Sequence, residues 1–330
     1  MRIDIRTHIM PEHMPNWTQK FGYGEFIHLE HSNCEACMMK GDKLFRVVEE
    51  NCFKENVRLK EMDETDVTIQ VLSTIPVLFN YWSKPADGFE TSRFFNDHIA
   101  ETSSKNPKRF IGLGTVPLQD IDLAIKEMER CIKELRLSGI EIGTNINGEN
   151  LSDKKFFPFY EAAEKLGCAL FVHPWEMMGE DKMQKYWLPW LVGMPAETSR
   201  AICSMIFGGV FEKFPTLRVA FAHGGGSFPF TIGRIKHGFD VRPDLVAIDN
   251  ITSPEDYIGK FWVDSLVHDK KAFQYLLEVM GEDKICLGSD YPFPLGEHKP
   301  GRLIQKMKLG KKVEKKLFSR NAEDWLGINP

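Results

Sequence analysis

The sequence predicts an α/β protein, a (β/α)8 barrel with a small insertion after its first strand. Eight short runs rich in apolar and β-branched residues alternate with longer segments of helical spacing, and eight parallel strand–helix units are the number that closes a TIM barrel. The 330 residues suffice for one such barrel, and no repeat or Ser/Gly-rich linker divides them. We therefore expect a single domain over residues 1–330.

The eight expected strands are nearly continuous apolar runs, as strands covered on both faces of a sheet should be. They span residues 2–6, 67–74, 111–117, 139–144, 169–173, 218–223, 261–266 and 285–290. The segment 120–135 is the clearest helix between them, because Ala124, Met128 and Cys131 follow the spacing of one apolar face. Further helices are expected at 89–104, 153–166, 196–214, 270–280 and 303–318.

The segment from about residue 11 to 54 separates the first strand from its helix and is too long for an ordinary loop. It is rich in aromatic, Gly and His residues, a composition that argues against disorder. Long segments of this kind in compact domains are usually functional, so we expect an insertion that caps one end of the barrel.

Composition excludes several classes of protein. Acidic residues number 47 against 42 basic ones, which gives a formal charge of −5 without a basic block, so a general nucleic-acid binder is not expected. No apolar run is long enough to span a bilayer, and the first residues do not resemble a secretory signal. The 7 Cys are odd in number and mostly scattered in apolar segments, which favours reduced thiols and a cytoplasmic location.

Catalytic groups are expected at the carboxyl ends of the strands, where such barrels carry them. The residues at or just after the ends of expected strands are His8, His173, His223 and Asp290. Imidazoles and a carboxylate that converge from separate strands are ligands that zinc prefers, with room left for water. A single histidine in such a place is more often structural, but the joint placement on several strands indicates an active site. Asp264 also ends a strand, and we expect it to hold a loop.

The sequence around these residues resembles the amidohydrolase superfamily. The matching motifs are Asp-Ile-Arg-Thr-His ending at His8, Leu-Phe-Val-His-Pro-Trp around His173, Phe-Ala-His-Gly-Gly-Gly around His223 and Gly-Ser-Asp-Tyr-Pro-Phe-Pro around Asp290. The segments 45–47, 187–198 and 233–234 are similar to the branch that decarboxylates 2-amino-3-carboxymuconate 6-semialdehyde. The resemblance runs nearly end to end and implies a metal-dependent, non-oxidative decarboxylase of tryptophan catabolism through kynurenine.

The resemblance also implies a cofactor and roles for individual residues. A single Zn²⁺ is expected, and the residues that match its ligands are His8, His173 and Asp290. His223 matches the acid/base histidine, and Asp290 is a further candidate to relay a proton. The residues expected to bind substrate are Arg46, Arg234, Trp190, Phe293, Lys43 and Arg242.

Arginine suits a small dicarboxylate substrate, because its guanidinium pairs with a carboxylate through two hydrogen bonds. An acidic protein that binds a dianion must concentrate positive charge locally, through the metal and the arginines together. The resemblance implies a homodimer in which Arg234 reaches the neighbouring subunit. Neither a nucleic acid nor a membrane is expected as a partner.

Arg6 departs from the family pattern, which has His-x-His after the first strand. Side chains at spacing two point the same way, so Arg6 occupies the place of a further ligand beside His8. Arginine stays protonated and cannot ligate a metal. Our hypothesis is that Arg6 weakens metal binding and impairs activity. The alternative is that Arg6 turns to a carboxylate and the site functions with three protein ligands.

Other functions fit the same residues. A hydrolase of an amide or lactone could use the same metal site but would not need Arg46 and Arg234. A decarboxylase of hydroxybenzoate-type acids belongs to the same branch, because the metal ligands alone do not choose the substrate. A metal-deficient pseudoenzyme that retains the fold and the dimer is the third alternative, and Arg6 is the residue that favours it.

Overall fold

Eight parallel strands form one sheet in the computed structural model, which describes residues 1–32 and 35–328. They follow one another in the order β1 (Ile3–His8), β5 (Ile69–Ser73), β6 (Phe110–Gly114), β7 (Gly139–Gly143), β10 (Ala169–His173), β11 (Val219–Phe221), β12 (Trp262–Asp264) and β13 (Ile285–Cys286). The chain after β13 returns to β1, because the amide of Ile5 donates to the carbonyl of Leu287 at 2.9 Å and the amide of His8 donates to the carbonyl of Tyr291 at 2.8 Å. The expected (β/α)8 barrel is confirmed.

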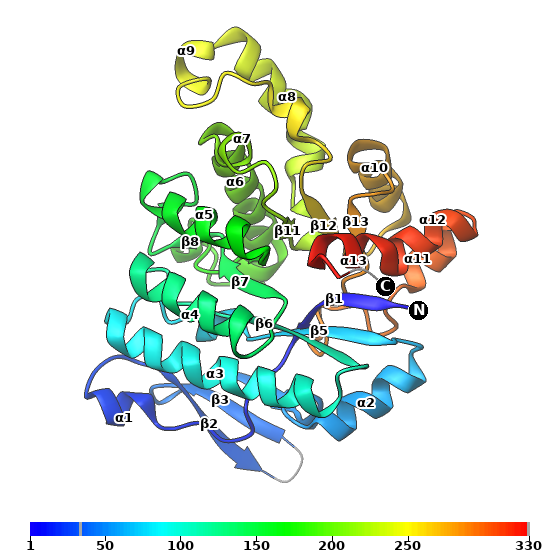
Figure 1. Ribbon diagram of the computed structural model, residues 1–330. Coiled ribbons are helices and arrows are strands. Elements are labelled where there is room, and N and C mark those ends of the chain that lie inside the picture. The colour runs from blue at the N-terminus through cyan, green and yellow to red at the C-terminus, as the bar shows by residue number, and fades with distance from the viewer. Residues whose placement is uncertain (33–34, 329–330) are drawn as a thin grey trace.

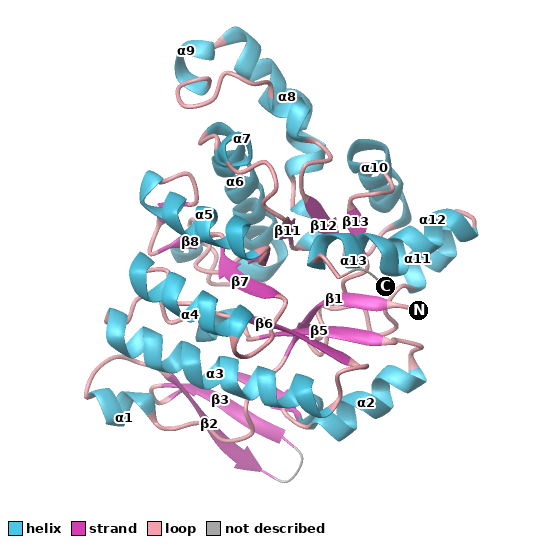
Figure 2. Ribbon diagram, in the orientation of Figure 1, coloured by secondary structure: helices cyan, strands magenta, loops and turns pink. Residues whose placement is uncertain are grey.

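Helices flank these strands (Figure 2). In α4 (Ile121–Lys133), Ala124, Met128 and Cys131 are buried as expected, and the Asp120 carboxylate caps the first turn by accepting from the amide of Leu123 at 3.0 Å. The other long helices are α2 (Glu55–Glu64), α3 (Pro85–Lys105), α5 (Phe157–Leu166), α6 (Met194–Phe207), α8 (Phe228–Val241) and α10 (Lys270–Met280). The short ones are α1 (Trp17–Phe21), α7 (Val210–Lys213), α9 (Pro243–Val246), α11 (Arg302–Met307), α12 (Lys311–Lys315) and α13 (Asn321–Leu326).

Three helical regions differ from the expectation. The segment 303–318 is divided into α11 and α12, because Lys308 takes a left-handed backbone conformation with a φ of 55°. The segment 196–214 is divided into α6 and α7 at Gly209, whose φ is 72°. The sequence signals of α8 and α9 are weak, because their apolar residues are not confined to a buried face and Phe230, for example, is 80% exposed. None of the helices in the described ranges is long and apolar enough to cross a membrane.

The segment between β1 and α2 forms a second sheet, which is antiparallel. Its strands, in order, are β2 (Ile27–Ser32), β3 (Glu35–Lys40) and β4 (Lys43–Glu49). Met38 and Val48 of this sheet share a buried apolar cluster with Ile75 and Phe293, which follow β5 and β13. The sheet therefore packs where barrel strands end. A capping role for segment 11–54, within one domain over 1–330, stays a prediction.

Arg58 links α2 to the strands that carry the candidate site. The residue is fully buried, its Nη1 donates to Oε1 of Gln70 at 2.9 Å, and its Nη2 donates to the carbonyl of His8. Its guanidinium also lies 4.7 Å from the centre of the Tyr291 ring. The same cation thus supports the backbone beside His8 and the segment that follows Asp290.

We expect Arg58→Met to lower the free energy of unfolding, because it leaves buried acceptors without a donor at about 1–3 kcal/mol each. Denaturant unfolding measures the loss. The matched control is Arg302→Met, an exposed arginine on α11 whose loss should change stability by less than about 0.5 kcal/mol. Equal unfolding curves for the two variants would refute the structural role of Arg58.

Candidate active site

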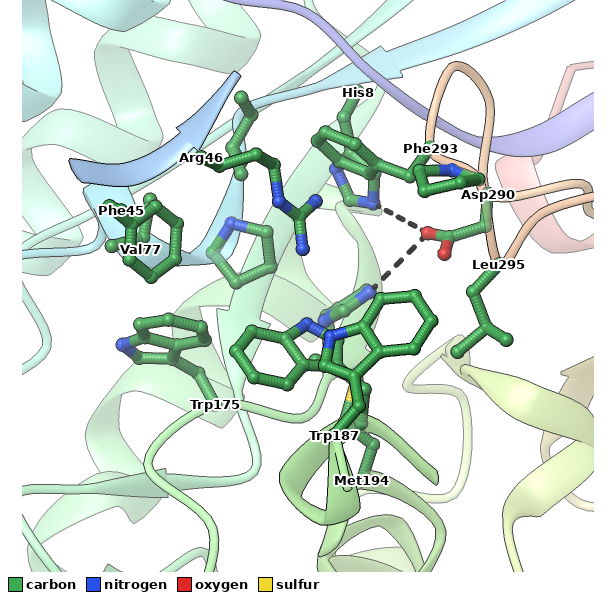
Figure 3. Close-up of a pocket in the computed structure, with 15 residues that line it drawn as sticks. His8, Phe45, Arg46, Val77, Trp175, Trp187, Met194, Asp290, Phe293 and Leu295 are labelled. Atoms are coloured by element: carbon green, nitrogen blue, oxygen red, sulfur yellow. Dashed lines mark hydrogen bonds and ion pairs between the residues drawn. The ribbon is translucent and has the colours of Figure 1, made fainter. Parts of the chain in front are cut away.

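Three candidate metal ligands converge at the carboxyl ends of the barrel strands. His8 ends β1, His173 ends β10, and Asp290 follows β13. One ligand atom from each residue lies within 4.8 Å of the other two. Nε2 of His8 lies 3.2 Å from Oδ1 of Asp290, and Nε2 of His173 lies 4.0 Å from the same oxygen (Figure 3). A single oxygen is therefore the point on which both imidazoles converge.

Backbone carbonyls hold the two imidazoles. Nδ1 of His8 lies 2.8 Å from the carbonyl of Thr74, and Nδ1 of His173 lies 3.1 Å from the carbonyl of Pro174, so we assign the proton of each ring to Nδ1. Nε2 of His173 then presents a lone pair, and within the described ranges this buried atom has no hydrogen-bond partner. Two imidazole nitrogens and a carboxylate oxygen in this arrangement fit a divalent cation such as Zn²⁺.

Arg6 enters the same space from β1 and is fully buried. Its Nη1 lies 2.7 Å from Nε2 of His223 and 3.1 Å from Oδ1 of Asp290. Its Nε lies 2.8 Å from Oδ2 of Asp264. Because a guanidinium has donors only, Nε2 of His223 is the acceptor in this pair. Arg6 therefore contacts two carboxylates, Asp264 and Asp290, and both lie within the candidate site.

Asp264 holds the loop after β11, as expected from the sequence. Its carboxylate accepts hydrogen bonds from the amides of His223 and Gly224, both at 2.9 Å, and from the amide of Leu266 at 3.0 Å. His223 has a φ of 57° and Asp290 a φ of 63°, conformations that are costly for residues other than glycine and that cluster at functional sites. The hydrogen bonds of Asp264 stabilise one of these two strained positions.

Burial and Arg6 together set the charges of the site. Burial opposes the charged form of Asp290, yet the positive charge of Arg6 holds the pKa of this carboxyl below its ordinary value. Burial lowers the pKa of His223, and Arg6 lowers it further. Burial is also the main cause of the lowered pKa of His173. A carboxylate at Asp290 beside a neutral His173 is the protonation state in which these two groups ligate metals.

A pocket opens beside these groups (Figure 3). Its apolar walls include Trp175, Trp187, Trp190, Met194 and Phe293. The charged or titratable side chains that line it are the three candidate ligands and Arg46. An apolar pocket with a few convergent polar groups is typical of a site for a small molecule.

Arg46 extends into this pocket from β4 (Figure 3). Its guanidinium carbon lies 4.4 Å from the centre of the Phe293 ring and 5.8 Å from the centre of the Trp190 ring. Burial lowers the pKa of Arg46, and the charge of Asp290 opposes that shift. In the part of the chain that the structure describes, no carboxylate forms an ion pair with Arg46. A half-buried cation between aromatic rings is therefore available to an anionic ligand.

The structure brings most of the expected site residues together. Those that line the pocket are His8, His173, Asp290, Arg46, Trp190 and Phe293. His223 lies behind them, with its ring centre 5.5 Å from that of His173. Trp175 and Trp187 are among the lining residues that were not expected. Both stand in or next to motifs already noted, since Trp175 follows the strand-end His173 by two residues.

Three expected substrate residues lie outside the pocket of their own chain. Lys43 is exposed at the first position of β4, next to the turn, where it pairs with Lys40. Arg242, at the end of α8, is exposed and pairs with Asp244 at 2.7 Å. Arg234 is exposed on α8. A role of Lys43, Arg234 and Arg242 in substrate binding stays a prediction.

Comparison with known proteins identifies relatives over nearly the whole chain. The family model described as amidohydrolase matches residues 3–328. A Dictyostelium discoideum protein named 2-amino-3-carboxymuconate-6-semialdehyde decarboxylase is 56% identical, covering 100% of this chain and 92% of its own. The Caenorhabditis elegans protein of the same name is 38% identical, covering 99% and 94%. A crystal structure of 5-carboxyvanillate decarboxylase from Novosphingobium aromaticivorans with bound manganese has the same fold, with a TM-score of 0.85 at 22% identity, covering 99% of this chain and 97% of that one.

Proposed function

The chain belongs to the amidohydrolase family, and from this premise we propose that it is a carboxy-lyase acting on 2-amino-3-carboxymuconate 6-semialdehyde. The products are 2-aminomuconate 6-semialdehyde and CO₂, a step of tryptophan catabolism through kynurenine. The observation that carries the proposal is the guanidinium of Arg46, which has no ion pair among the described residues and lies between aromatic rings in the pocket of His8, His173 and Asp290. Two relatives named for this activity, 56% and 38% identical, support the substrate.

We propose that the cofactor is a single Zn²⁺, and that His8, His173 and Asp290 would hold it. The buried, unpartnered Nε2 of His173 and the short distances between the three ligand atoms support a divalent cation there. When bound, the ion supplies positive charge and Lewis acidity at the reacting end of the pocket. These three residues fit the ion, whereas Arg6 does not.

The protein's own residues bind the acid and hold the proton. Arg46 pairs with a substrate carboxylate through two parallel hydrogen bonds, and Trp190 and Phe293 pack on the conjugated chain and exclude water. Apolar walls favour neutral CO₂ over a carboxylate, which loses hydration there. Loss of CO₂ leaves an electron pair on carbon that a proton must take up. We assign His223 to hold and return that proton, with Asp290 as the second candidate.

We further propose a cytoplasmic homodimer. α8 and α9 project from the body of the barrel (Figure 1), and the exposed apolar side chains on and after them are Phe230, Val241, Leu245, Ile248 and Ile251. A second copy that covers this arm would bury them, and Arg234 on α8 would then reach the partner's pocket. The cysteines described by the structure are all free, which supports a reducing compartment.

Mixing two inactive variants tests the role of Arg234 across the interface. We expect Arg234→Met and Asp290→Asn each to be inactive alone. After the chains are mixed and exchanged, a mixed dimer has one pocket with both Asp290 and the neighbour's Arg234, so about a quarter of the parental activity should return. A mixture that stays inactive although exchange is demonstrated would contradict action across the interface.

The proposed activity is tested with enzymatically generated substrate and protein supplied with excess zinc, with an Arg6→His variant assayed alongside. We expect the near-ultraviolet absorbance of the substrate to fall while an equal amount of CO₂ is released. Loss of absorbance without CO₂ would favour a hydrolase. Turnover of hydroxybenzoates instead would favour that alternative, and no change with metal-loaded protein of either form would contradict a decarboxylase.

A further inference from the structure

Arg6 and His8 enter the site side by side. They stand two residues apart on β1, so their side chains point the same way into the barrel. The guanidinium of Arg6 ends among three groups: Oδ1 of Asp290 at 3.1 Å, Oδ2 of Asp264 at 2.8 Å and Nε2 of His223 at 2.7 Å. The charged end of Arg6 therefore contacts a candidate metal ligand, the carboxylate that holds the loop, and the candidate proton carrier.

The contact with Asp290 puts Arg6 in competition with a metal ion. Oδ1 of Asp290 is the oxygen on which Nε2 of His8 and Nε2 of His173 converge, at 3.2 and 4.0 Å. It is the same oxygen that Nη1 of Arg6 contacts. An ion held by the three ligands would share its only carboxylate oxygen with a guanidinium and would lie close to a permanent positive charge.

Arg6 partly neutralises the buried carboxylates that it contacts. Asp264 and Asp290 bring two negative charges into a buried space, and Arg6 neutralises one of them. A divalent ion added beside Arg6 would turn the net charge of this group from one negative to one positive. With a neutral histidine at position 6, the same two carboxylates would be balanced exactly by a divalent ion and would be uncompensated without it.

A role for Arg6 in binding substrate is not supported. Arg6 is fully buried and does not line the pocket, whereas Arg46 does. Nη2 of Arg6 has no hydrogen-bond partner in the described part of the chain, but this atom is enclosed as well. The guanidinium therefore acts on the ligands and on His223, not on a molecule in the pocket.

We propose that Arg6 is a built-in cation of this site, which holds Asp264, Asp290 and His223 in place without metal and makes the binding of a divalent ion weak. The inference rests on the proposed function, because that reaction uses a metal ion. It concerns how much of this metal the chain retains. Arg6 also keeps Nε2 of His223 unprotonated, because the lone pair of Nε2 accepts a hydrogen bond from Arg6 as long as the two are in contact.

Metal content and thermal stability test the proposal without an activity assay. Wild type, Arg6→His and Arg6→Met are incubated with excess Zn²⁺, freed of unbound ion, and analysed for zinc per chain; melting is then followed with EDTA and with added Zn²⁺. We expect little zinc in the wild type, with a melting temperature that responds to neither addition. Arg6→His should retain close to one zinc per chain, melt lower in EDTA, and bind zinc on the order of 100-fold more tightly than the wild type.

Arg6→Met separates the charge from the missing ligand. It has the same three ligands as the wild type and no cation, so it should bind zinc more tightly than the wild type and less tightly than Arg6→His. A wild type that retains about one zinc and loses stability in EDTA would overturn the proposal, as would equal zinc affinity in the wild type and Arg6→Met. If Arg6→His fails to fold, the comparison of the wild type with Arg6→Met still tests the proposal.

The outcomes also separate this inference from the proposed function. Metal-loaded Arg6→His that releases no CO₂ would contradict the decarboxylase, although the effect of Arg6 on metal binding would stand. A wild type that retains zinc and decarboxylates would contradict the role of Arg6, although the function would stand.

Discussion

Arg46→Met is expected to lower kcat/KM for the proposed dicarboxylate substrate by about 30- to 5,000-fold, equivalent to about 2–5 kcal/mol for a lost buried charge pair. Most of the loss should be in KM, because Arg46 would bind substrate and transition state alike. Arg46→Lys keeps the charge but not the two parallel hydrogen bonds, so it should recover only part of the loss. Steady-state kinetics on metal-loaded protein measures each variant.

Stability separates this effect from misfolding. Arg46 is half-buried between aromatic rings without an ion pair among the described residues, so its replacement by Met should not lower the melting temperature. Arg302→Met, on the exposed surface of α11, is the matched control and should leave kcat/KM unchanged. If Arg46→Met and Arg302→Met turned over the substrate equally well, Arg46 would not be the carboxylate-binding residue.

His223→Asn is expected to lower kcat by about 10²- to 10⁴-fold, the usual contribution of a positioned general acid or base. Asparagine tolerates the left-handed backbone at this position, where φ is 57°, so the loop should keep its shape. Because His223 is not one of the three converging ligands, zinc content should not change. Kinetics and metal analysis of one preparation, in the wild-type and Arg6→His backgrounds, give both values.

His268→Asn is the matched control for this substitution. His268 is exposed and also has a left-handed backbone, with a φ of 60°, but among the described residues it does not contact Arg6 as His223 does. Its replacement should leave kcat unchanged. A similar kcat for both variants, or a loss of zinc in His223→Asn alone, would remove His223 from the role of proton carrier.

The barrel could be predicted because its strands are buried on both faces. Runs such as 169–173 are continuous apolar segments that end in a candidate ligand, and β10 covers that run residue for residue. The helical spacing of 120–135 is equally informative, because Ala124 and Cys131 had to face the core. The same logic placed the candidate ligands at strand ends, where the barrel brings them together.

The remaining features depend on contacts between distant segments. Nothing in the local pattern indicates that Lys308 adopts a left-handed conformation, and this single residue divides an expected helix. The exposed apolar residues of α8 do not form a one-sided pattern, so the helix has no clear signal. The sequence places Arg6 two residues before His8, but the pairing of Arg6 with Asp264, at the end of β12, emerges only when the barrel is assembled.

We propose decarboxylation of this substrate through a metal whose occupancy Arg6 limits. It is tested most directly by CO₂ released per chain, measured on samples of the wild type and Arg6→His whose metal content is determined at the same time. We expect CO₂ release to rise in proportion to bound metal in both proteins and to be greatest in Arg6→His. Metal-free wild type that releases CO₂ as fast as metal-loaded Arg6→His would contradict the account.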